Sequence, residues 1–127
     1  MNRSKHRLVA LGLTHALLGA AHAQTESGLQ AISDLAQLNG QALACQDLKS
    51  AGRAKSLMLA HAPKTARFGT AFEEGTQQGY LAQTRGKSAC PDTAALSARL
   101  DALAQQLQIN LPAKAQDAAA NTSAETQ

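Results

Sequence analysis

Residues 24–127 contain no valine and only two isoleucines, Ile32 and Ile109. The aromatic residues of the whole chain are Phe68, Phe72 and Tyr80. β-Strands are built mainly from β-branched and aromatic residues, and this chain has too few of them to form a sheet. Alanine, leucine and glutamine are frequent instead, and all three favour helices. The sequence therefore predicts an all-α fold.

Apolar residues recurring at helical spacing predict a small bundle of three to four helices, packed around Leu, Ile, Met and Phe side chains. Proline at 63 and at 112 ends two of the helical segments, because the residue before a proline is pushed out of the helical region. The segment 46–62 fits either a separate helix or the far half of one long bent helix. The expected helices cover residues 26–44, 46–62, 65–83 and about 92–110.

Glycines inside two of these helices allow more than one interpretation. Gly40 marks a bend, a break or a close contact with another helix, because glycine costs about 1 kcal/mol in a helix interior. In the third helix, Ala71, Gly75, Gly79 and Ala82 form a stripe of small residues. The stripe indicates tight packing against a neighbouring helix, since small side chains let two backbones approach closely. Alternatively, the two glycines only weaken their helix.

The N-terminal segment 1–23 has the three parts of a cleavable secretory signal peptide. Its first seven residues carry three positive charges and no acid, and an apolar run follows from 8 to 21. It ends in Ala21-His22-Ala23, with small residues where signal peptidase needs them. A membrane anchor is the alternative, but the run is shorter than the about 20 residues of a spanning helix. We expect cleavage near Ala23-Gln24 and a periplasmic mature protein.

Removal of this segment changes the charge of the chain. The whole sequence has a formal net charge of +3, and three of its twelve basic residues lie before residue 24, whereas all nine acids lie after it. The mature chain is thus close to neutral, and its few aromatic residues make no stacking platform, so we expect no nucleic-acid partner. Three parts are expected: the signal peptide 1–23, a helical domain 24–111 and a disordered tail 112–127 that has no large apolar residue after Leu111.

The mature chain keeps two cysteines, Cys45 and Cys90. An even number of cysteines in a small exported domain predicts a disulfide bond. A redox pair, a metal site and free thiols are the alternatives, but the spacing is not C-x-x-C and no cluster of histidines accompanies it. A disulfide at this separation would add roughly 4 kcal/mol to the stability of the domain.

The least generic stretch of the chain lies between residues 59 and 74, where a lone histidine, a proline, basic residues and both phenylalanines occur together. His61 fits either a general base paired with Glu73 or Glu74, or a cap at the C-terminus of its helix. The basic residues between 49 and 67 fit either a site for an anionic partner or a solvated helix face. Our candidate binding corner consists of Lys55, His61, Lys64, Arg67, Phe68 and Phe72.

No phosphate-binding loop, haem-attachment motif, zinc-protease motif or nucleophile elbow occurs in the sequence. We therefore expect a non-enzymatic binding, accessory or structural protein without cofactor or metal, whose partner is another periplasmic protein, and no transmembrane segment after cleavage. A small helical domain with one long-range disulfide is similar in outline to the small acid-stress chaperones, so a stress chaperone is the first alternative. An enzyme or redox protein using Cys45 and Cys90, or His61, is the second.

Overall fold

The described part of the chain consists of helices joined by short loops. A computed structural model describes residues 17–113, with the side chains from residue 25 onward, and this part forms four helices and no strand. The all-α prediction is therefore confirmed. Most of the expected signal peptide and nearly all of the expected tail lie outside the described residues. The helices are α1 (Leu17–Ala44), α2 (Leu48–His61), α3 (Ala66–Arg85) and α4 (Thr93–Asn110).

Helix α1 starts before the expected boundary at residue 26, because the alanine-rich sequence favours helix through the expected cleavage position. Its C-terminal end settles the question about residues 46–62. Gln46 takes a positive φ of 60°, which no helix can continue, and the Asp47 side chain then accepts a hydrogen bond of 3.0 Å from the backbone N–H of Ser50. This cap begins α2 as a separate helix.

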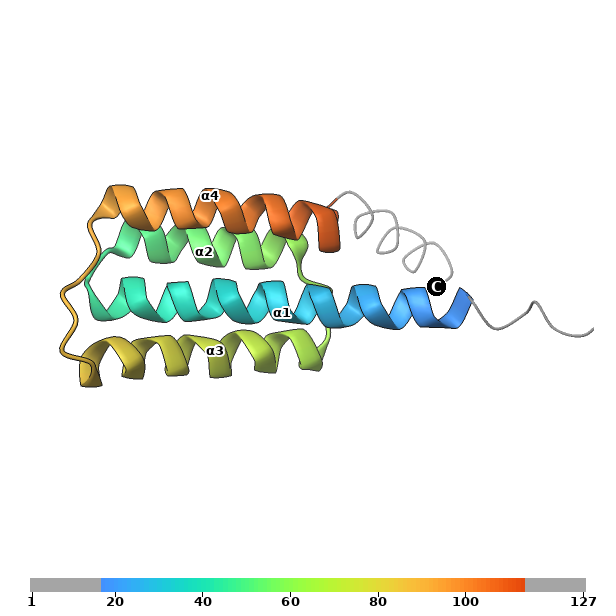
Figure 1. Cartoon of the computed structure of the whole chain (residues 1–127), viewed down its shortest axis with the longest axis horizontal. Coiled ribbons are helices and arrows are strands. Elements are labelled where there is room, and N and C mark those ends of the chain that lie inside the picture. Colours follow the sequence, from blue (N-terminus) through green and yellow to red (C-terminus); the bar gives the residue numbers. More distant parts are fainter. Residues whose placement is uncertain (1–16, 114–127) are drawn as a thin grey trace, which may run out of the picture.

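Helix α1 lies at the centre of the fold, with α2 and α4 on one side and α3 on the other (Figure 1). This position explains why its residues are buried on more than one face, including the polar Asn39. Five leucines of α1 and α4 are almost completely buried in the contact of these two helices with their neighbours. The core consists mainly of Ile32, Leu35, Leu38, Ala51, Ala54, Phe68, Leu96, Leu100 and Leu107.

Glycines bring α1 and α3 into backbone contact. A Cβ atom on Gly79 would overlap the main-chain carbonyl of Gln37, and one on Gly40 would overlap the carbonyl of Thr76. A Cβ atom on Gly75 would come within 2.7 Å of the Ala36 Cβ. The close-contact interpretation of both glycine patterns is therefore confirmed, and Gly40 does not interrupt α1.

Cys45 and Cys90 form the expected disulfide, with their Cα atoms 5.6 Å apart. Cys45 follows the last residue of α1, and Cys90 lies in the loop that leads into α4. The bond therefore fixes the loop 86–92 against the end of the central helix. The C-terminal end of α3 continues directly into this loop. The disulfide therefore also limits how far α3 can separate from α1.

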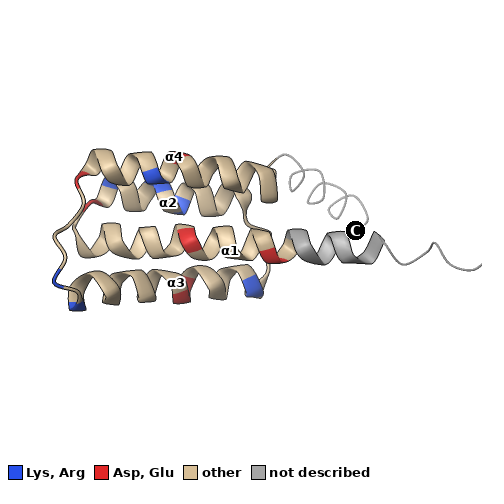
Figure 2. Ribbon diagram, viewed as in Figure 1, with Lys and Arg blue, Asp and Glu red and all other residues tan. Residues whose placement is uncertain are grey.

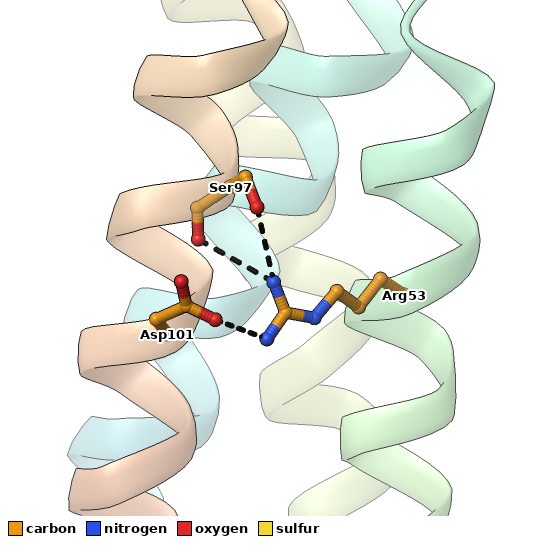
Figure 3. A network of polar contacts seen from close by, with 3 residues as sticks. All are labelled: Arg53, Ser97 and Asp101. Atoms are coloured by element: carbon orange, nitrogen blue, oxygen red, sulfur yellow. Dashed lines mark hydrogen bonds and ion pairs between the residues drawn. The ribbon is translucent and has the colours of Figure 1, made fainter.

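Polar contacts hold α2 against α4. The Arg53 guanidinium donates hydrogen bonds to the backbone carbonyl and the hydroxyl of Ser97, at 3.4 and 3.3 Å, and forms an ion pair with Asp101 (Figure 3). The N-cap of α4 is Asp92, whose carboxylate accepts a hydrogen bond of 2.7 Å from the Ala95 N–H. Arg53 is one of the basic residues between 49 and 67, and its contacts show that this residue holds two helices together.

The Asp47 cap makes the start of α2 sensitive to acid. Hydrogen bonds from the Ser50 backbone N–H and from the Ser50 hydroxyl lower the pKa of the Asp47 carboxyl below its ordinary value of 3.8. A lowered folded-state pKa means that the ionised carboxylate stabilises the fold above the ordinary value, and that this contribution disappears as the pH falls through the folded-state pKa.

We expect Asp47→Asn to lower the melting temperature at pH 7, because asparagine caps a helix without the charge. Melting curves of both proteins between pH 7 and pH 2 would test this. The difference between them should stay constant down to about pH 4 and then shrink toward zero. A difference that is unchanged at the lowest pH would show that ionised Asp47 does not support α2.

Candidate functional site

An open groove lies between α2 and α3, with α1 as its floor. It has a volume of about 540 Å³, which is in the range of roughly 300–1,000 Å³ typical of binding pockets. The groove exists because α2 and α3 both pack on α1 and make little contact with each other (Figure 1). Most of its wall is apolar, and it is lined by Asn39, Leu43, Lys55, Phe72, Glu73, Thr76, Gln77, Tyr80 and Leu81.

A buried amide lies at the floor of this α2–α3 groove. Asn39 is 1% exposed, and its Nδ2 donates a hydrogen bond of 3.0 Å to the Thr76 hydroxyl. Its Oδ1 has no hydrogen-bond partner among the described residues. Unsatisfied buried acceptors are uncommon in folded proteins and cost roughly 1–3 kcal/mol. The amide therefore fixes α3 against α1 at some cost in stability.

The two rims of the groove carry opposite charges. Lys55 comes from α2 and Glu73 from α3, and both side chains are exposed. Within residues 25–113, neither lies within ion-pair distance of an opposite charge. Basic residues occur on α2, and both basic and acidic residues occur on α3 (Figure 2); of these, Lys55 and Glu73 line the groove.

Exposed apolar side chains lie beside the groove. Tyr80 lines its wall and is 44% exposed. Leu48 and Leu59 of α2 are 72% and 80% exposed. Leu48 lies seven residues before Lys55 and Leu59 four residues after it, so all three lie on the same face of α2. The wall of the groove therefore continues into apolar surface on its α2 side.

The structure brings only two residues of the expected binding corner into the groove, Lys55 and Phe72. Phe68 is buried in the core, and Lys64 is exposed in the loop between α2 and α3. Arg67 pairs with Glu26 of α1 at 2.6 Å, in a separate shallow hollow. The stretch between residues 59 and 74 thus joins two helices whose side chains face different neighbours.

His61 is buried, and its Nδ1 lies 2.8 Å from the backbone carbonyl oxygen of Leu111. A carbonyl oxygen only accepts, so Nδ1 carries the proton and donates it to this hydrogen bond. The contact joins the C-terminal ends of α2 and α4. The His61 ring therefore bonds to the end of α4 and does not cap the C-terminus of its own helix, where the Ala62 N–H bonds to the Met58 carbonyl.

Sequence reasoning missed several groove residues, among them Asn39, Thr76 and Leu81. Tyr80 is an aromatic residue in the same predicted helix as Phe72, and this is the one signal in the sequence that points to the groove. Nothing in the linear sequence indicates that α2 and α3 lie on opposite sides of α1. The groove depends on that arrangement, and so it could not be predicted.

Among residues 25–113, no three His, Cys, Asp or Glu side chains are grouped so that they could hold a metal ion. In the same part of the chain, no helix has the length and apolar character needed to cross a bilayer. No known protein family, no characterised protein and no solved structure matches this chain. The fold defines a small, disulfide-bonded helical protein, and its candidate site is the α2–α3 groove.

Proposed function

We propose that this chain is exported by residues 1–23 and acts in the periplasm as a non-enzymatic protein that associates with another protein through the α2–α3 groove. The observation that carries the proposal is the groove itself. It combines about 540 Å³ of open volume with mainly apolar walls and with exposed apolar side chains beside it. Exposed apolar surface of this kind is typical of protein interaction sites.

Two observations support export. The segment 1–23 has the charge pattern, apolar run and small residues of a cleavable signal. The Cys45–Cys90 disulfide suits an oxidising compartment, whereas the reducing cytosol keeps most thiols free. Cleavage before residue 24 would also leave the packed part of α1 intact, because Gly28 is the first buried residue among those whose burial is described.

The state of the reactive side chains supports a binding role over catalysis. The two cysteines are bonded to each other, and His61 uses its Nδ1 proton to join two helix ends. The charged groups of the groove, Lys55 and Glu73, are exposed on its opposite rims. A surface of this kind is suited to recognising a partner by shape, apolar contact and rim charge.

An apolar fluorescent dye, anilinonaphthalene sulfonate, tests the proposal on the mature protein. The dye should bind in the groove and receive excitation energy from Tyr80, which is the only tyrosine of a chain without tryptophan. Tyr80→Ser should weaken dye binding about tenfold, because half-exposed aromatic surface contributes roughly 1–2 kcal/mol to such a contact. A fluorescence titration with the dye excited directly measures this change, on protein dilute enough to keep the groove uncovered.

Ile109→Ser is the matched control for this titration. Ile109 is 75% exposed on α4, and it does not line the groove. Its replacement should leave dye binding unchanged. Equal losses in both variants, or no loss in either, would contradict the assignment of the groove as the binding site.

A stress-chaperone role is the second candidate, and the acid-sensitive Asp47 cap favours it. Loss of this cap at low pH would loosen the start of α2 and expose more of the apolar interior. The dye titration repeated at low pH separates the two candidates. A fixed binding groove keeps one dye site, whereas a chaperone of this type gains dye sites and suppresses the aggregation of an unfolded protein.

A further inference from the structure

We infer that the partner covering the α2–α3 groove is a second copy of this chain, which makes the mature protein a homodimer. The inference rests on the proposed function, because it names the partner of the same groove. Its basis is the match between two helical stripes that border the groove. Each stripe consists of four residues, and the two stripes have identical spacing along helices of opposite direction.

The stripe on α2 contains Leu48, Gly52, Lys55 and Leu59. These residues follow one another at intervals of four, three and four, so they lie on one face of the helix and span about 16 Å. Lys55 places this face at the groove. Gly52 leaves a gap in the stripe, because a Cβ atom built on it meets no atom within 4 Å.

The stripe on α3 contains Gly69, Glu73, Thr76 and Tyr80, again at intervals of four, three and four. Its last three members line the groove. Gly69 leaves a gap like that at Gly52, since the space around its Cβ position is also empty. Both stripes therefore contain one charge and one open glycine position, with two exposed leucines on α2 and one exposed tyrosine on α3.

A two-fold axis running along the groove exchanges its two rims, so the α2 stripe of one copy meets the α3 stripe of the other. The helices α2 and α3 run in opposite directions (Figure 1), so the shared spacing lets the members of the two stripes pair one to one in reverse order. Lys55 of one copy faces Glu73 of the other. At the same time Leu48 faces Tyr80, and Leu59 faces the gap at Gly69.

Each contact in this arrangement occurs twice, and each one is complementary. The two Lys55–Glu73 contacts bring together opposite charges that lack an ion-pair partner within residues 25–113 of one chain. Leu48, Leu59 and Tyr80 lose water contact in both copies. The mature chain is nearly neutral, so no long-range repulsion opposes the association of two copies. A different partner would have to reproduce this pattern, whereas a second copy already carries it.

Sedimentation of the mature protein and of its charge variants tests the inference. The wild type should dimerise. Lys55→Glu should create two contacts between acids, and Glu73→Lys should create two contacts between bases. Each variant alone should therefore self-associate about tenfold more weakly or worse. An equimolar mixture of the two variants should form dimers again, because both contacts between unlike variants join opposite charges.

Recovery in the mixture would show that the contact lies between two copies, since a contact within one chain cannot be restored by mixing. Both residues are exposed, and circular dichroism should confirm that the variants fold. As a second disruption, Leu59→Glu should also abolish the dimer, whereas Ile109→Glu on α4 should not.

A wild type that stays monomeric at all concentrations, or a mixture that stays monomeric, would overturn the inference. Dye binding distinguishes a failure of this inference from a failure of the proposed function. A monomer that binds the dye in a Tyr80-dependent manner refutes the second copy as the partner and keeps the groove as a binding site. A monomer that does not bind the dye refutes both.

Discussion

Replacing both Cys45 and Cys90 with serine is expected to destabilise the protein by about 4 kcal/mol. The disulfide closes a loop with a sequence separation of 45, and cross-linking such a loop removes roughly this much conformational entropy from the unfolded chain. A domain of this size has a total stability of about 5–15 kcal/mol, so the bond contributes a large share. The small number of large core residues makes the domain depend on it.

Urea unfolding followed by circular dichroism measures this effect. The midpoint of the serine variant should lie roughly 3 M below that of the oxidised protein, taking a slope of about 1.3 kcal/mol per M. Wild-type protein treated with a reductant is the control, and it should unfold at nearly the same midpoint as the variant. Oxidised and reduced wild type with equal midpoints would mean that the bond does not constrain the unfolded chain.

The second large effect is expected at Gly79. Gly79→Ala should cost about 3 kcal/mol, because the added Cβ atom meets the main-chain carbonyl of Gln37 and α1 and α3 must separate. In an exposed helix the same change stabilises by about 1 kcal/mol. The sign of the effect therefore depends on the backbone contact between the two helices, and the melting temperature should fall by roughly 15 °C.

Gly52→Ala is the matched control, since Gly52 lies in the middle of α2 with open space around its Cβ position. This variant should be more stable than the wild type by about 0.5–1 kcal/mol. Thermal unfolding of both variants measures the difference. If the two substitutions changed stability in the same direction, α3 could not lie against α1 as described.

The helices and the disulfide could be predicted from the sequence because they depend on local preferences and on the number of cysteines. The lack of valine in residues 24–127 argued against a sheet, and Pro63 predicted an end of α2 close to where the helix stops. The break at Gln46 was less visible, since a positive φ at a glutamine has no signature in the sequence. For this reason the segment 46–62 allowed two interpretations.

The arrangement of the helices in space could not be predicted from the sequence. The small residues of α3 indicated a close contact but did not identify α1 as the partner, although Gly40 supplies the other half of that contact. The expected binding corner grouped residues by their closeness along the chain. Phe68 and Phe72 show the weakness of this approach, because one is buried in the core and the other lines the groove.

Collisional quenching of Tyr80 fluorescence by acrylamide tests most directly whether a second copy covers the groove. Tyr80 is the only tyrosine of a chain that has no tryptophan, and it lines the groove at 44% exposure, so its emission reports on this surface alone. As the concentration of the protein rises, quenching should decrease severalfold in the wild type and stay constant in Lys55→Glu. Quenching of the wild type that stays the same while the protein dimerises would contradict the account, since the dimer would then use another surface.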